Sequence, residues 1–308
     1  MVHWCCLAGL TVALLAPCPV LARQADPGSA SAERDIVVTG ELPPQREVTR
    51  QARAITVPTG IDTAPLPLFA DRLCPGVFGI RSDFAAVIID RIRANAERFE
   101  LPMTEDDGTC APNFVVAFVD DGRMTLQEIA DEQYRLFRGT PWRERLKLLA
   151  EDGPARAWTA TETRTRDGVP LPEDPVTGVQ TAAQWNAASR VLLPVREDIV
   201  FVLVLIERNA APGRTLLQLA DYATMRGLAR TRPVEADRAP LDTILVLFDP
   251  SAEPPSELTA FDSAYLGALY RGSPAKAGLG KVVAVNGELR RQAAAEQAAG
   301  AAEAPVAE

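Results

Sequence analysis

The most continuous apolar run of the chain after its N-terminal segment covers residues 199–206, Ile-Val-Phe-Val-Leu-Val-Leu-Ile. Branched and aromatic side chains in a run of this length favour a β-strand, and the lack of a polar position predicts that both faces are covered. We therefore expect a central strand here, preceded by a turn at residues 196–198. Shorter runs of the same kind predict strands at residues 114–119, 158–166 and 191–195.

Apolar residues at helical spacing predict helices between and after these strands. Ser82 is the predicted N-cap of a helix to residue 99, with an apolar face of Phe84, Val87, Ile88, Ile92 and Phe99. Three capping boxes, Thr125 with Glu128, Thr215 with Gln218, and Thr259 with Asp262, each predict the start of a helix. The helices that follow are expected over residues 125–137, 216–229 and 259–270, and a further short one over 142–149.

The order of these elements predicts an α+β fold, with one mixed β-sheet and helices packed on it. Residues 241–248 and 282–285 are expected to add short extended segments or strands. The globular domain is predicted to cover residues 73–289, and residues 290–308 form an Ala- and Glu-rich tail.

Residues 23–72 are rich in Pro, Ala, Arg and Asp and contain only brief apolar patches. Such a composition buries little surface against the entropy of ordering the chain, so we expect a flexible extension. Within it, residues 35–40 read Asp-Ile-Val-Val-Thr-Gly and resemble the start of the plug domain of TonB-dependent outer-membrane receptors. The resemblance implies a contact with envelope transport machinery.

The N-terminal residues have the pattern of a secretion signal. An almost uncharged apolar run covers residues 4–16, and small residues at Val20 and Ala22 precede Arg23, so cleavage is expected after Ala22. The signal would comprise residues 1–22 and would direct the protein to the periplasm or the cell exterior, with no stable membrane span after cleavage. The alternative is an inner-membrane anchor formed by an uncleaved signal, although the run is short for a span.

Removal of this signal changes the inventory of reactive side chains. It leaves Cys74 and Cys110 as an even pair in an oxidising compartment, and we expect them to form a disulfide. It also removes His3, the only histidine of the chain. Ser-His-Asp triads, Cys-His pairs and most catalytic zinc sites are thereby excluded, and no metal or cofactor is expected.

The net charge of the chain is -9 at pH 7, which argues against a general nucleic-acid binder. Acid chemistry without histidine would depend on carboxylates, as in paired-acid hydrolases. The candidates are Asp120 at the end of a predicted strand, Asp221 in a predicted helix, and Glu162. Each also has a purely structural interpretation, as a turn residue or as a solvent-facing charge.

Residues 220–227, Ala-Asp-Tyr-Ala-Thr-Met-Arg-Gly, resemble the H-E-x-x-H-x-x-G helix of the metzincins, with Ala220 and Thr224 at the two histidine positions. Residues 258–270 resemble a second segment of secreted zincin-like proteins. The resemblance implies a degenerate zincin-like scaffold that has lost its zinc ligands, as in secreted bacterial proteins of unknown function. An ordinary amphipathic helix with an exposed Asp221 and Arg226 accounts for the same residues.

Three functions remain open from the sequence. The first is a non-catalytic binding or envelope-interaction protein, whose partner is an unknown envelope protein or a small ligand. The second is a histidine-independent hydrolase that uses carboxylates. The third is a partner of TonB-linked transport through residues 35–40. The absence of histidine after signal cleavage favours the first function over the second.

Overall fold

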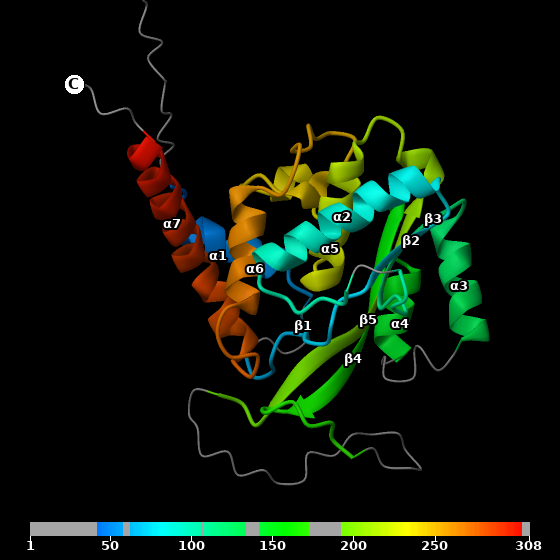
Figure 1. Ribbon diagram of the computed structural model, residues 1–308, viewed down its shortest axis with the longest axis horizontal. Helices are drawn as coiled ribbons and strands as arrows, with labels where there is room; N and C mark the ends of the chain where they lie inside the picture. The colour runs from blue at the N-terminus through cyan, green and yellow to red at the C-terminus, as the bar shows by residue number, and fades with distance from the viewer. Residues whose placement is uncertain (1–41, 58–61, 106–107, 134–141, 173–191, 304–308) are drawn as a thin grey trace, which may run out of the picture. The chain divides into compact units, whose positions relative to one another are not determined.

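A computed structural model describes residues 42–57, 62–105, 108–133, 142–172 and 192–303 (Figure 1). Its sheet is built around the long strand β5 (Val195–Glu207). On one edge of β5 run β3 (Phe114–Val119) and the short β1 (Leu68–Phe69), both parallel to it. Next to β3 lies β2 (Pro75–Phe78), again parallel, and β4 (Ala155–Thr165) pairs antiparallel with the other edge of β5. The predicted mixed sheet is confirmed.

Helices cover both faces of this sheet (Figure 1). The larger core joins α1 (Gln45–Ile55), α2 (Ser82–Arg98), α5 (Leu216–Leu228), α6 (Ala260–Tyr270) and α7 (Gly278–Glu303) to one face. The smaller core lies on the other face, where α3 (Gly122–Glu132) packs near Trp158 and Leu203 and α4 (Trp142–Leu149) borders it. Short 3₁₀ helices are formed by Arg208–Ala210, Ala236–Arg238 and Ile244–Val246.

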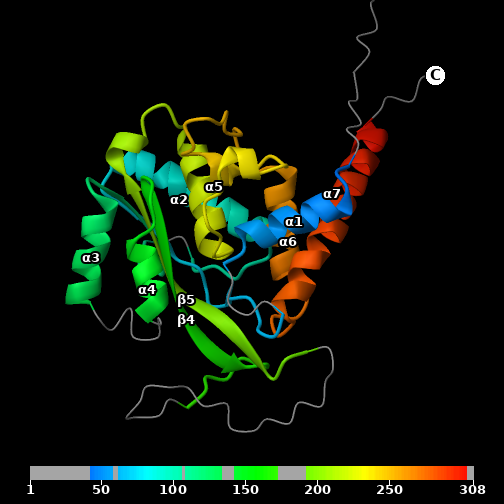
Figure 2. The ribbon, with the colours of Figure 1, turned by 180° about the vertical axis from the view of Figure 1, so that it is seen from behind.

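The flexible extension predicted for residues 23–72 is wrong for its described C-terminal part. Val48, Ala52 and Ile55 of α1 are fully buried, and α1 packs against α7 (Figure 2). Phe69 of β1 is also buried, so the folded unit begins at residue 42. The sequence of α1 has a low average hydrophobicity, so the helix was not predicted. An amphipathic helix needs only one narrow apolar stripe when a neighbouring helix covers that stripe.

Residues 196–198 do not form the predicted turn. Arg196, Glu197 and Asp198 lie inside β5, opposite Arg164, Thr163 and Glu162 of β4. Cross-strand ion pairs between Arg164 and Asp198 and hydrogen bonds from Thr163 to Glu197 allow these charges to stay in the sheet. Three consecutive charged residues predict a turn, because the sequence shows their polarity but not their partners on the neighbouring strand.

Other boundaries also differ from the sequence predictions. Residues 241–248 contain the 3₁₀ helix Ile244–Val246 and no strand, and Val282 and Val285 are buried positions within α7. The same helix runs through the predicted boundary at residue 289, because Leu289 is also buried against the core. The described part of the predicted tail, residues 290–303, therefore continues this helix, and its residues 294–300 are exposed.

Two helix starts differ in their capping residues. Asp121 accepts a hydrogen bond from Met124 N–H and caps α3 four residues before the predicted capping residue Thr125. Ser82 is the first helical residue of α2, with Arg81 at the N-cap position. The predicted apolar face of α2 is also displaced, since Phe84 and Val87 are exposed while Ala85 and Ala96 are buried beside Ile88 and Ile92.

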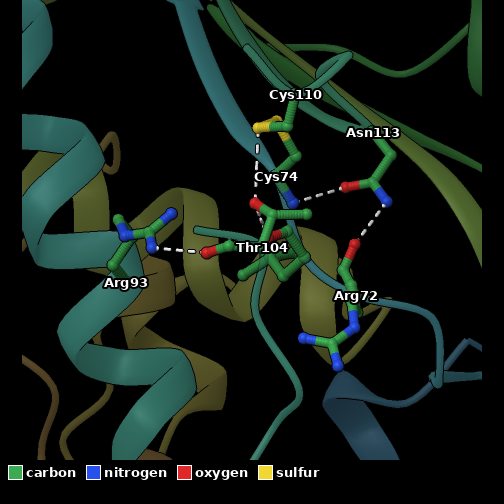
Figure 3. Close-up of a disulfide and its surroundings, with 7 residues drawn as sticks. Arg72, Cys74, Arg93, Thr104, Cys110 and Asn113 are labelled. Carbon is green, nitrogen blue, oxygen red and sulfur yellow. Dashed lines mark hydrogen bonds between the residues drawn. A yellow bond between two sulfur atoms is a disulfide. The ribbon is translucent and has the colours of Figure 1, made fainter. Parts of the chain in front are cut away.

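The capping boxes predicted at Thr215 and Thr259 are confirmed, and they begin α5 and α6. The predicted disulfide is also confirmed, between Cys74 at the start of β2 and Cys110 (Figure 3). Asn113 supports it by accepting from Cys74 N–H at 2.8 Å and donating to the Arg72 carbonyl at 2.9 Å. The disulfide thus ties the segment before β3 to the start of β2.

The predicted signal at residues 1–22 and the motif at residues 35–40 lie outside the described residues. Within the ranges that are described, no helix is both long and apolar enough to cross a membrane.

Candidate ligand-binding site

Asp221 is fully buried on α5 and is surrounded by hydrogen-bond donors. Arg91 Nε and Nη2 donate to its two carboxylate oxygens at 2.7 and 2.8 Å, and Asn95 Nδ2 donates at 2.7 Å. The Leu258 N–H adds a fourth donor at 2.9 Å. These four hydrogen bonds join α2, α5 and the segment that leads into α6. They occupy the lone pairs of the carboxylate, so none is left for a substrate. The exposed position predicted for Asp221 is therefore wrong.

The two histidine positions of the metzincin-like pattern lie in the same interior. Ala220 and Thr224 are both fully buried. The Thr224 hydroxyl donates to the Ala220 carbonyl at 2.9 Å and accepts from Asn95 Nδ2 at 3.1 Å. Gly227, at the glycine position, lies so close to Phe114 that an added Cβ would be 2.4 Å from the ring. These positions serve helix packing, and the zincin-like resemblance itself remains a prediction.

The other two candidate acids lie apart from Asp221. Asp120 is largely exposed and pairs with Arg208. Glu162 lies on β4 and pairs with Arg164 at 2.8 Å, and the same guanidinium reaches Asp71 and Asp198 at 3.1 Å. The structure thus gathers Glu162 with Asp71 and Asp198 and leaves Asp120 and Asp221 elsewhere.

Asp198 is the buried centre of that charged group. Burial raises the pKa of its carboxyl group, while Arg196 at 2.7 Å and Arg164 oppose the shift. Its Oδ1 atom is buried without a hydrogen-bond partner among the described residues. Two guanidinium groups nevertheless hold Oδ2, which suits a structural ion-pair network at the end of the sheet.

A cavity of about 390 Å³ lies beside β4, between the end of α4 and the segment that follows α5. Its volume is in the range that is usual for small-ligand sites, about 300–1,000 Å³. The apolar part of its lining is formed by Val57, Leu148, Ala157, Trp158 and Pro233. The polar part is formed by Lys147, Glu151, Thr159, Arg226, Arg230, Thr231 and Arg232.

Four cationic groups and one carboxylate line this cavity, in a chain whose net charge is negative. The most buried of them is Arg226, which is 2% exposed and donates to Tyr222 Oη at 2.8 Å and Glu151 Oε1 at 2.7 Å. Burial disfavours the charged guanidinium, but Tyr222 and Glu151 outweigh it and hold the pKa of Arg226 above its ordinary value. The cavity wall therefore contains a permanently charged guanidinium in a desolvated position, and Glu151 is its counterion.

Two buried polar atoms in the lining have no protein partner. Arg226 Nε and Thr159 Oγ1 are both inaccessible to solvent in the empty cavity wall and make no hydrogen bond to any described residue. Buried donors of this kind cost about 1 to 3 kcal/mol each when left unsatisfied. Both side chains belong to the cavity lining, but neighbouring protein atoms cover these two polar atoms, so the contacts open to a bound molecule come from the other polar atoms of the lining.

Arg230 is held in an unusual backbone conformation at the cavity. Its φ of 46° lies in the left-handed region, two residues after the end of α5. Glycine usually occupies this position after a helix, and a larger residue costs about 1 to 2 kcal/mol. A pairing between Thr56 and Thr231 and a hydrogen bond from Thr231 to the Met225 carbonyl fix the segment. The strain places a guanidinium in the lining where a glycine would give none.

A second, more open hollow lies along α1 and is lined by Arg46, Arg50 and Arg53 together with Val283. These arginines are exposed side chains of one helix face. The cavity beside β4 instead joins cationic groups from α4, α5 and the segment after α5 to an apolar wall. The cavity beside β4 is therefore the better candidate site.

Sequence reasoning missed this site. Arg226 was predicted to be exposed, and neither Lys147 nor residues 230–233 belong to a recognisable motif. The one available signal was a run of arginines, Arg226, Arg230 and Arg232, directly after a predicted helix. Comparison with protein-family models, curated proteins and solved structures gives no match for this chain.

Proposed function

We propose that this chain is an exported, non-catalytic binding protein that holds a small organic anion in the cavity beside β4. The observation that carries the proposal is a lining that combines four cationic groups and one acid with an apolar wall. An anion bound there accepts charge-assisted hydrogen bonds from the cationic groups of the lining. The disulfide between Cys74 and Cys110 fits export to an oxidising compartment.

The lining also favours a ligand with an apolar part. Trp158, Leu148, Val57 and Pro233 line the cavity, so a ligand can bury hydrocarbon against them while its charged end contacts the arginines. Inorganic anions lack that complement. A carboxylate or phosphate attached to a hydrophobic group is the chemical class that uses both halves of the site.

Binding without catalysis is favoured by the state of the acids. Glu151, the carboxylate among the described lining residues, is engaged by Arg226, and Asp221 is saturated by four donors elsewhere in the core. Paired-acid hydrolysis needs two carboxyl groups that face one substrate, about 5 to 9 Å apart. The hydrolase alternative has no such pair in this cavity to support it.

The experiment measures binding of phenylacetate, phenyl phosphate and the uncharged phenylacetamide by isothermal titration calorimetry. We expect both anions to bind and the amide to bind about tenfold or more weakly, because its neutral group loses charge-assisted hydrogen bonds. Equal binding of acid and amide, or no binding of either anion, would refute the proposal.

Matched variants locate the binding site. Lys147→Gln combined with Arg230→Gln removes two positive charges from the cavity, and Arg46→Gln with Arg50→Gln removes two from α1. Binding should be lost in the first double variant and retained in the second. The reverse result would move the site to the hollow along α1.

Interaction with TonB-linked transport remains a separate proposal, since residues 35–40 alone suggest it. Deletion of these six residues should abolish co-purification with envelope components. Unchanged co-purification would remove that proposal and leave the cavity unaffected.

A further inference from the structure

The cavity lies along an edge of β4 that pairs with no further strand among the described residues, and this edge indicates what kind of anion the cavity accepts. Over residues 155–163, β4 pairs with β5 and with no other segment in the described part of the chain. Ala157 and Thr159 of β4 both belong to the cavity lining. Their backbone groups must therefore be accounted for together with the side chains.

The ladder between β4 and β5 shows which way those groups point. Glu207 N–H donates to the Pro154 carbonyl at 2.8 Å, which makes these two residues a hydrogen-bonded pair. In an antiparallel ladder such pairs alternate with pairs that exchange no hydrogen bond. The register pairs Ala157 with Val204 and Thr159 with Val202, so both fall in the second class and their N–H and C=O groups point away from β5.

The far edge of β5 confirms this alternation. Val202 N–H donates to the Asn113 carbonyl at 2.9 Å, on the side opposite β4. Its partner Thr159 must then direct its own N–H and C=O outward as well. Two backbone donors and two backbone acceptors, from Ala157 and Thr159, thus point away from β5, and in the described ranges no protein group pairs with them.

We infer that the bound anion is the carboxyl-terminal end of an extended peptide, which pairs with β4 as an additional strand. This inference rests on the proposed function and specifies its ligand. A peptide main chain offers N–H and C=O groups at the spacing that Ala157 and Thr159 require, whereas a simple organic anion offers none.

The position of the cations indicates that the bound peptide ends in a free carboxylate. Arg226, Arg230 and Lys147 line the same cavity as the two outward-facing residues, so the negative charge must lie close to the ladder. A terminal carboxylate continues the main chain and lies in line with that ladder. A side-chain carboxylate stands out from the plane of a sheet instead.

The apolar lining then receives the side chains next to that carboxylate. Trp158 and Leu148 belong to the side of the sheet covered by α4, and Val57 with Pro233 lies near the end of α5. Alternate residues of a strand point to opposite sides, so successive peptide side chains would meet one group and then the other. A small or medium apolar residue at each position fits the cavity volume.

The test uses the peptide acetyl-Ala-Thr-Val-Leu with a free carboxylate, its carboxamide, and four versions in which one backbone nitrogen is methylated. We expect the free acid to bind about tenfold or more tightly than phenylacetate, since the ladder adds several hydrogen bonds. Methylation should weaken binding about tenfold at alternate nitrogens and have little effect at the others, because every second amide of a strand faces its partner.

A protein variant tests the same ladder from the other side. Ala157→Pro removes a backbone N–H that β5 does not use, and proline is tolerated on edge strands for that reason. Peptide binding should fall about tenfold while phenylacetate binding stays within about twofold. Should this variant fail to fold, the methylated peptides still test the ladder.

The outcomes separate the two proposals. Binding of phenylacetate without tighter binding of the peptide, or without alternation among the methylated peptides, would overturn the strand-pairing inference and leave anion binding intact. Equal binding of the free acid and the carboxamide would overturn the terminal-carboxylate inference. Failure of both phenylacetate and the peptide to bind would overturn both proposals.

Discussion

Arg91 on α2 donates two parallel hydrogen bonds to Asp221 on α5, Nε to Oδ1 at 2.7 Å and Nη2 to Oδ2 at 2.8 Å. The carboxylate is fully buried, whereas the arginine keeps part of its side chain exposed and also reaches Glu257 at 3.0 Å. This pair fixes two helices that cover the same face of the sheet. A residue that the sequence suggested as a catalytic acid therefore acts as a structural link.

Asp221→Ala should destabilise the protein by about 3 to 5 kcal/mol, because it leaves Arg91, Asn95 and the Leu258 N–H without their acceptor in a buried place. The measurement is urea unfolding followed by tryptophan fluorescence. Asp120→Ala is the control, since its pair with Arg208 is largely exposed and its removal should leave the unfolding midpoint unchanged. Similar midpoints for both variants would contradict this account of Asp221.

Asp262 predicts a pH dependence of stability. Burial raises the pKa of its carboxyl group to about 6, against the hydrogen bonds from Thr243 and from the Ile244 and Thr259 N–H groups. The folded protein thus binds this proton more tightly than the unfolded chain. Its contribution to stability is complete below pH 3.8 and is lost as the pH rises through about 6.

The test compares the wild type with Asp262→Asn, which is expected to be less stable at every pH because an amide cannot accept all three hydrogen bonds. Between pH 7 and pH 5 the wild type should gain about 1 kcal/mol relative to this variant. Chemical unfolding at several pH values gives the difference directly. Parallel pH profiles would show that Asp262 does not titrate in this range.

The disulfide predicts a loss of stability on reduction. Cys74 and Cys110 are 36 residues apart, and closing a loop of this length stabilises a fold by about 3 to 4 kcal/mol in the chain-entropy treatment. Cys74→Ser with Cys110→Ser should lose about that amount in urea unfolding. The wild type under reducing conditions should match the double variant. A wild type that is indifferent to reductant would mean that the bond contributes little.

Some structural features that depend only on neighbouring residues were predicted correctly from the sequence. Thr215 and Thr259 marked helix starts because a hydroxyl three residues before Gln or Asp caps a helix without help from the rest of the fold. The central strand at residues 199–206 was found for a similar reason. An unbroken run of branched apolar residues has few alternatives to a covered strand.

Features that depend on partners distant in sequence were missed. Arg226 and Asp221 are polar residues that lie in the core because Glu151 and Arg91, each about 75 or more positions away, neutralise them. The unpaired edge of β4 could not be predicted either, because strand order and register decide which backbone groups remain unpaired. The candidate site consists almost entirely of such long-range features.

Gly227 occupies the glycine position of the metzincin-like pattern, and helix packing alone explains why a glycine is needed there. A methyl group added there would lie 2.4 Å from the Phe114 ring and 2.7 Å from Val202 Cγ1, so α5 approaches the sheet through this glycine. Gly227→Ala should cost about 1 to 3 kcal/mol through overpacking, despite the better helix propensity of alanine. Gly287→Ala on α7 is the matched control, because no atom lies within 4 Å of the added methyl group. That control should gain up to about 1 kcal/mol from propensity alone. Unfolding free energies of the two variants should therefore move in opposite directions, and a gain at Gly227 would mean that the close approach of α5 to Phe114 is not required for the fold.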